Sequence, residues 1–140
     1  MTSQDGKVQR VKPAKVKTYK IKDFLRLTET GKIDIGRSKE IVRQLAAAAA
    51  FHEDHNILLD LRETTIKEEN MSDALEVALE IARYKSAFKG KLANLLPNDK
   101  KRLFLAKQLK ALIAMEGFQY EIFTSFEEAM EWLSDITVLS

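Results

Sequence analysis

The chain contains no cysteine, which excludes disulfide bridges, thiolate zinc sites and cysteine nucleophiles. Glycine is scarce too, with five residues in 140, and no glycine-rich phosphate loop is present. Gly31-Lys32 and Gly90-Lys91 lack the upstream glycine and the following serine or threonine of a P-loop. No GxGxxG or GxSxG pattern occurs, which argues against a dinucleotide enzyme and an α/β-hydrolase.

Long apolar segments are also missing. The longest apolar block, Leu45 to Phe51, is far too short to span a bilayer, and the basic N-terminus lacks the apolar segment of a secretory signal. The absence of cysteine suits a reducing compartment. We therefore expect a cytoplasmic protein without a transmembrane segment, and a chain of this length predicts one domain.

The net charge of +2 is unevenly distributed along the chain. Residues 1–22 hold seven lysines and arginines against Asp5 alone, a net charge of +6, so the remaining residues sum to −4. A basic arm can bind nucleic acid or an anionic membrane, or it can be a solvated tail. Because Tyr19 is its only aromatic residue, we expect nucleic-acid binding to be unlikely. We expect residues 1–14 to be a flexible arm and 15–140 one domain.

The most informative segment runs from Asn56 to Thr65, where an apolar run ends abruptly in charged and hydroxyl side chains. Such a run is typical of a strand buried on both faces of a parallel sheet. An amphipathic helix pattern follows from Ser72. Because function in open α/β sheets gathers at the carboxyl ends of strands, the segment from Arg62 to Ser72 is the first place to expect a site.

Periodicity and capping residues predict the remaining elements. Strands at 16–21 and 24–30 would form a hairpin around Lys22-Asp23. A helix is expected from Ser38 to Phe51, a second from Ser72 to Gly90, and then a strand at 92–96. A third helix is expected from Asn98 or Asp99 to Gly117, and its inward side chains would be Leu105, Leu109, Leu112 and Met115. A strand at 120–123 and a helix begun by the capping-box pair Thr124 and Glu127 follow. This order predicts an α/β fold: a mainly parallel five-stranded sheet with an antiparallel first strand, and four helices.

Two charged clusters are candidate binding sites. His52-Glu53-Asp54-His55 lacks HExxH spacing and a further histidine, so we expect no metal and no cofactor there. Lys100, Lys101 and Arg102 fall in the first turn of a helix, where cations oppose the helix dipole. They are either a site for an anion or acidic partner, or simply solvated side chains.

Hydroxyl residues follow the buried strand. Thr64, Thr65 and Ser72 have no histidine base nearby, so acyl-transfer catalysis lacks its general base. Ser72 is most simply a helix N-cap. Alternatively Ser72 is phosphorylated, which would add about −1.5 to −2 charge where the helix dipole tolerates anions.

Several segments together resemble STAS-like proteins, a group that includes the bacterial anti-sigma-factor antagonists and the looser STAS/SEC14-like relatives. The resemblance covers about residues 16–134 and implies a small β/α superhelix that docks on protein partners. In the antagonists a partner kinase phosphorylates a serine in an Asp-Ser-Ser/Thr-Gly context; here the region reads Met71 to Leu75, without that motif, and Ser72 is the nearest match. The segments that carry the resemblance are Ile57 to Arg62, the helix from Ser72, Lys91 to Leu96, and Ile122 to Leu133.

The sequence therefore favours a non-enzymatic, cytoplasmic, bacterial regulatory domain of the partner-switching kind. Its expected contacts with a protein partner are Arg62, Glu63, Thr64, Thr65 and Ser72. One alternative is a small-molecule or lipid-binding domain, which would need an apolar pocket of roughly 300 Å3 or more. Another is weak nucleic-acid or anion binding through the basic arm, with steep salt dependence.

Overall fold

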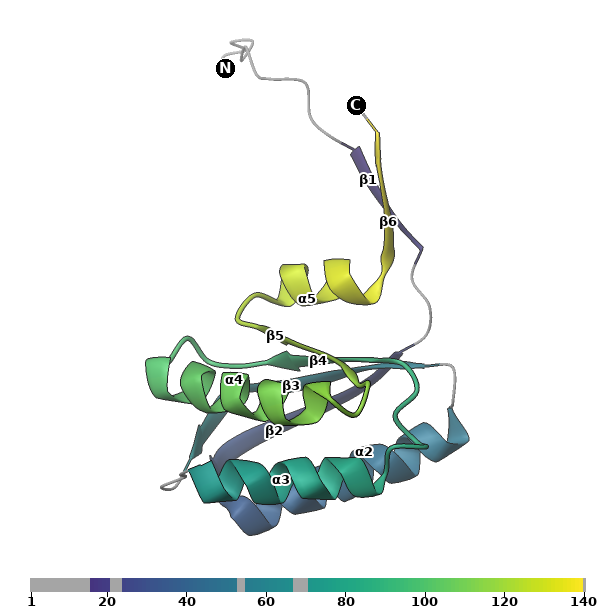
Figure 1. Cartoon of the computed structure of the whole chain (residues 1–140). Coiled ribbons are helices and arrows are strands. Elements are labelled where there is room, and N and C mark those ends of the chain that lie inside the picture. The colour runs from purple at the N-terminus through teal and green to yellow at the C-terminus, as the bar shows by residue number, and fades with distance from the viewer. Residues whose placement is uncertain (1–15, 21–23, 53–54, 67–70, 140) are drawn as a thin grey trace, which may run out of the picture.

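A computed structural model describes residues 16–20, 24–52, 55–66 and 71–139, and its centre is a four-stranded sheet whose strands are all parallel (Figure 1). The strands lie in chain order: β2 (Phe24–Ile33), β3 (Asn56–Ile66), β4 (Lys91–Leu95) and β5 (Gln119–Phe123). The described helices are α2 (Ile35–Phe51), α3 (Met71–Arg83), α4 (Lys100–Ala114) and α5 (Phe126–Leu133). The α/β class and the four helices are thus confirmed.

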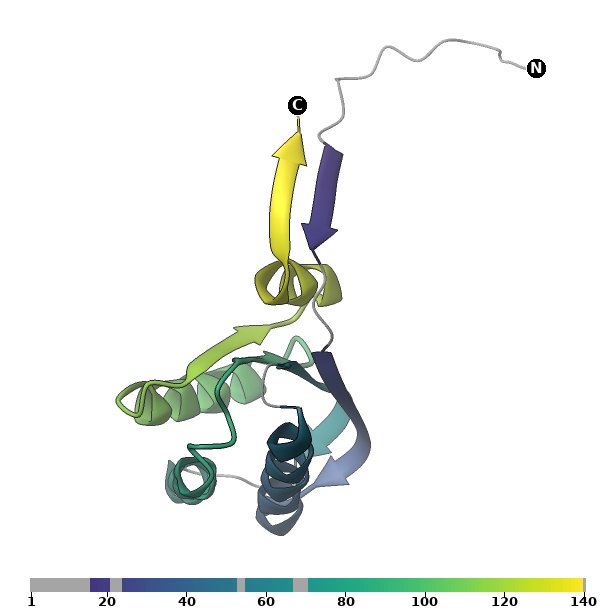
Figure 2. The same cartoon turned by 90° about the vertical axis from the view of Figure 1, so that its right-hand side faces the viewer.

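The helices divide unequally between the two faces of the sheet. Each crossover steps to the next strand in the same direction, and right-handed crossovers then place their helices on one face. Accordingly α2, α3 and α4 cover one face, whereas α5 lies on the other (Figures 1 and 2). No helix in the described part of the chain is both long and apolar enough to cross a lipid bilayer.

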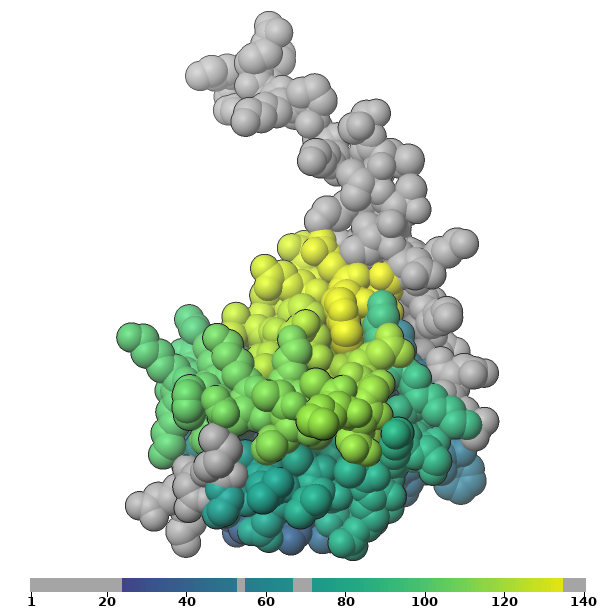
Figure 3. All heavy atoms as spheres, viewed as in Figure 1, coloured from purple at the N-terminus to yellow at the C-terminus, as the bar shows by residue number. Residues whose placement is uncertain are grey.

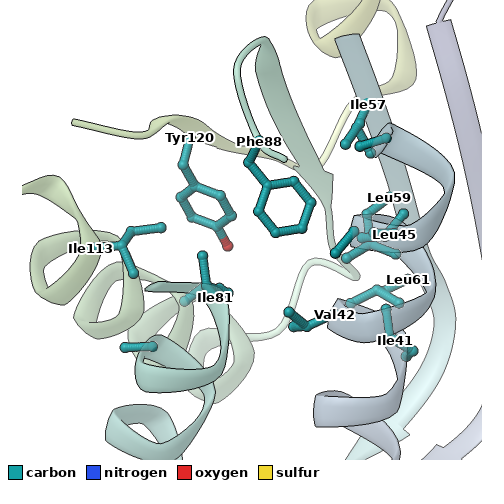
Figure 4. Close-up of a cluster of buried hydrophobic side chains, with 14 of the residues drawn as sticks. Ile41, Val42, Leu45, Ile57, Leu59, Leu61, Ile81, Phe88, Ile113 and Tyr120 are labelled. Carbon is teal, nitrogen blue, oxygen red and sulfur yellow. The ribbon is translucent and has the colours of Figure 1, made fainter. Parts of the chain in front are cut away.

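Alternate residues of β3 supply both cores. Ile57, Leu59 and Leu61 are buried in the larger core beneath the three helices (Figure 4). Leu58 points to the opposite face, into a smaller core that it shares with Ala93, Leu95, Ala129 and Leu133. Burial on both faces explains why this strand reads as an almost unbroken apolar run.

A bulge in β3 changes which face its later residues meet. Thr28 of β2 lies opposite Asp60, but Thr30 lies opposite Glu63, so β3 has one additional residue between these pairs. Beyond the bulge, Thr64 contacts Arg102 of α4, on the three-helix face. Without the extra residue, strand alternation would direct Thr64 to the face of Asp60.

The predicted N-terminal hairpin is wrong. β1 (Val16–Lys20) pairs antiparallel with β6 (Asp135–Leu139) in a separate two-stranded ribbon that projects from the α5 side (Figures 1 and 2). The sheet therefore has four parallel strands instead of five with an antiparallel first strand. Local pattern could not reveal this pairing, because it joins opposite ends of the chain and β6 was not expected as a strand. The predicted turn at Lys22-Asp23 lies outside the described residues.

Among the predicted capping residues, the one for α4 is confirmed and those for α2 and α5 are wrong. Asp99 caps α4 as expected, but Asp34 instead of Ser38 caps α2, where its side chain accepts a hydrogen bond from a first-turn backbone N–H at 2.8 Å. Ser125, not Thr124, caps α5. Each region holds several competent capping residues, and the point where the preceding strand ends selects one of them.

The second helix also differs from its expected bounds. α3 begins at Met71, so Ser72 lies inside its first turn instead of at its N-cap, and the helix ends at Arg83 instead of near Gly90. Gly90 lies where the chain enters β4: a Cβ there would be 2.8 Å from the Asn56 side-chain oxygen. That oxygen accepts from the backbone N–H of Lys91, while the Asn56 amide donates to the carbonyl of Leu133. Asn56 thereby fixes the end of α5 to the start of β3 and β4.

Candidate functional site

A carboxylate and two arginines meet on the α5 face of the sheet. Asp60 of β3 accepts hydrogen bonds from Nη2 of Arg26 at 3.0 Å and from Nη2 and Nε of Arg62 at 2.9 and 3.0 Å. Asp60 is buried, whereas the side chains of Arg26 and Arg62 are 45% and 38% exposed. The buried carboxylate therefore holds two guanidinium groups at the surface in fixed positions.

An aromatic ring completes this cluster. The Cζ atoms of Arg26 and Arg62 lie 5.4 and 5.9 Å from the ring centroid of Phe126, within cation–π range. Phe126 is the first residue of α5, directly after the capping residue Ser125. It lies just beyond the carboxyl end of β5, where ligand sites of open α/β sheets usually occur. We call Arg26, Arg62 and Phe126, with Asp60 beneath them, the arginine rim.

Electrostatics keep Asp60 ionised. The side-chain hydrogen bond from Arg62 is the main cause that lowers the pKa of Asp60 to about 2, against the opposing effect of burial. The backbone N–H of Arg62 and the side chain of Arg26 lower it further. Reciprocally, Asp60 raises the pKa of Arg62. Within the rim two positive charges meet one negative charge, and Glu63, outside the rim, also interacts electrostatically with Arg62.

Asp60→Asn is expected to reduce the free energy of unfolding by about 1–2 kcal/mol at pH 7, discounted because both arginines are partly exposed. The folded-state pKa of Asp60 lies below its ordinary value of 3.8. The stabilisation from Asp60 is therefore fully present above about pH 5, roughly one unit above the ordinary pKa, and is lost as the pH falls toward the folded-state pKa of about 2. Urea unfolding of both proteins at pH 7 and at pH 2.5 measures this. An Asp60→Asn deficit that is equally large at both pH values would contradict the proposed pairing.

The residues expected to contact a partner fall in different environments. Arg62, Glu63 and Thr65 are exposed near the end of β3. Thr64 is buried: its hydroxyl donates to the carbonyl of Leu61 at 2.6 Å and accepts from Arg102, so it is not available to a partner. Ser72 is exposed, but on α3, which covers the face of the sheet opposite the arginine rim.

The cationic start of α4 also differs from expectation. Lys100 and Lys101 are exposed, but Arg102 is buried, and its Nη1 and Nη2 donate to the carbonyl and hydroxyl of Thr64 at 2.9 Å each. Arg102 therefore joins α4 to β3 instead of serving an exposed anion site. Leu109 packs against the larger core as expected, but Leu112 is 38% exposed, and Met115, which follows the last residue of α4, is 91% exposed.

Of the histidine cluster, only His52 and His55 lie in the described part of the chain. The rings of His52 and His55 are 4.8 Å apart and tilted by 59°, while Glu53 and Asp54 lie outside the described part of the chain. Within the described ranges, no three histidine, aspartate or glutamate side chains are grouped so as to hold a metal ion.

Sequence reasoning missed Arg26, Asp60 and Phe126. One signal was present, because Asp60 interrupts the apolar run and a carboxylate at a buried strand position requires a partner.

No protein-family model matches the chain, and neither a curated protein nor a solved structure gives a match.

Proposed function

We propose that this chain is a non-enzymatic regulatory domain of the STAS-like type, which binds a partner protein through the arginine rim. The observation that supports this most strongly is the pair of half-exposed arginines, held by the buried Asp60 and lying over Phe126. Arginine and aromatic side chains are enriched at the energetic centres of protein interfaces. Side chains already fixed before binding lose less conformational entropy on association.

The chemistry of the rim favours an acidic partner. A guanidinium group has five N–H donors, and in the described contacts Arg26 reaches Asp60 through Nη2 alone. The remaining donors suit a carboxylate, which arginine binds in a planar, two-pronged geometry. The partly exposed ring of Phe126 offers apolar contact beside this charge. A partner segment with an acidic residue next to an apolar one would satisfy both.

The STAS-like assignment is supported by chain order, since a parallel strand is followed by a helix at each step from β2 to α5. In this proposal the domain acts in the bacterial cytoplasm in a partner-switching pathway. Because α3 covers the face opposite α5, a phosphate on Ser72 would alter a second surface and leave the arginine rim unchanged.

Affinity purification from a lysate of the source cells tests the proposal, with wild type compared against Arg62→Ala and Phe126→Ala. We expect a partner that both variants lose by tenfold or more, corresponding to about 1.4 kcal/mol. Arg83→Ala is the matched control, because Arg83 is exposed at the end of α3, on the other side of the sheet. Recovery of the same proteins with all four baits would refute binding through the rim.

A further inference from the structure

A cavity of about 130 Å3 lies between the sheet and the three helices α2, α3 and α4. Its walls are mainly apolar, and Figure 4 shows Val42 and Leu45 of α2, Ile81 of α3 and Phe88 of the segment after α3 converging on this region. It is smaller than the roughly 300 Å3 of a typical drug-sized site. It is close in size to an engineered apolar cavity of about 150 Å3 that binds benzene, so a single ring fits.

The polar side chains in the cavity wall are Ser38, Asp73, Asn94, Arg102 and Tyr120. Asn94 of β4 and Tyr120 of β5 are both buried, and the Asn94 side-chain nitrogen donates to the Tyr120 hydroxyl at 2.6 Å. Asn94 is 6% exposed, and its Oδ1 has no hydrogen-bond partner. Buried polar atoms are almost always bonded, so an acceptor left open in a cavity wall indicates a missing donor.

The Tyr120 hydroxyl adds a donor beside this acceptor. Because it accepts from Asn94, its own hydrogen is available to a guest, and Figure 4 shows the hydroxyl pointing from its strand toward Ile81. Burial raises the pKa of Tyr120 to about 12, which keeps that proton in place. A guest hydroxyl can donate to Asn94 and accept from Tyr120 at the same time.

We propose that this cavity binds a small neutral aromatic alcohol, whose hydroxyl bridges Asn94 Oδ1 and Tyr120 Oη while its ring fills the apolar space. A water molecule could bond to Asn94 but would leave the apolar remainder unfilled. Arg102 also lines the cavity, but Nη1 and Nη2 of its guanidinium already donate to Thr64. Asp73 also lines the cavity, and its carboxylate disfavours an anionic guest. The proposed guest is therefore neutral, and its binding does not depend on the arginine rim.

Titration of the full chain with phenol, toluene and benzoate tests the proposal, followed by calorimetry and by NMR of the Asn94 side-chain amide. We expect phenol to bind with a dissociation constant of roughly 1 mM or tighter and to shift the Asn94 signals. Toluene, which has the ring but no hydroxyl, should bind about tenfold more weakly. Benzoate should bind more weakly than phenol, because the cavity disfavours charge.

Two variants test whether the side chains of Asn94 and Tyr120 bind the hydroxyl of the guest. Asn94→Leu should bind toluene at least as well as phenol, and Tyr120→Phe should reduce phenol affinity about fivefold; the second remains informative if the first does not fold. Arg62→Ala should leave phenol binding unchanged, which separates this result from the rim. Absence of phenol binding, equal affinity for phenol and toluene, tighter binding of benzoate, or an unchanged phenol preference in Asn94→Leu would each overturn the proposal.

Discussion

Leu58→Ala is expected to destabilise the fold by about 3–5 kcal/mol. Leu58 has 0% of its surface exposed and packs in the smaller core between the sheet and α5. Because β3 is hydrogen-bonded to β2 on one side and β4 on the other, its backbone cannot move to close the space left by the lost side chain. The large end of the usual range for leucine truncation therefore applies.

Urea unfolding, monitored by circular dichroism, measures this loss as a shift in midpoint. Leu79→Ala is the matched control, since Leu79 is 61% exposed on α3 and its truncation should change stability by less than about 0.5 kcal/mol. A loss below about 1 kcal/mol in Leu58→Ala would mean that α5 does not pack on the sheet as described.

The same substitution bears on the arginine rim. Phe126 is the first residue of α5, and this helix is joined to the sheet through the core around Leu58. Loosening α5 should displace the ring from beneath Arg26 and Arg62. Near-ultraviolet and fluorescence signals of Trp132, which packs against the same core, report that displacement while the protein remains folded.

Arg102→Met is expected to reduce the free energy of unfolding by about 2–4 kcal/mol. Methionine retains much of the apolar stem of the arginine but removes two hydrogen bonds to Thr64, each 2.9 Å long. The carbonyl of Thr64 then loses this donor in a buried position, where desolvation is not compensated. The contact between α4 and the end of β3 should weaken with it.

Lys101→Met provides the control, because Lys101 is the exposed neighbour in the same helical turn and should change stability by about 0.5 kcal/mol or less. A double-mutant cycle with Thr64→Val should give a coupling energy of about 1–2 kcal/mol. Coupling near zero, or equal effects of Arg102→Met and Lys101→Met, would show that the buried contact does not stabilise α4.

Much of the fold could be predicted because its signals are local. The apolar run from Ile57 to Leu61 predicts a doubly buried strand, and the helical periodicity from Ala74 to Ile81 predicts the helix that follows it. Asp99, one of the two residues predicted to cap α4, was found for the same reason. The pairing of β1 with β6 has no such local signal, since each strand is short and its partner lies at the other end of the chain.

The candidate site was predicted only in part. Arg62 was expected at the surface and is partly exposed, but its partners come from β2 and α5, which are distant in sequence. Arg102 was expected to be exposed, either in a site for an anion or acidic partner or as a solvated side chain. Its burial follows from the bulge in β3, which directs Thr64 toward α4 and provides two acceptors for a guanidinium.

By itself, the sequence determined the α/β class, the central strand, the four helices and the exclusion of thiol chemistry, because hydrophobic periodicity and residue type act over a few neighbouring residues. Only the tertiary structure decided which arginine is buried, which aromatic ring lies beside Arg26 and Arg62, and that Asn94 and Tyr120 border a cavity. These outcomes depend on strand register and on the face to which each helix packs, which are set by contacts between residues far apart in the chain.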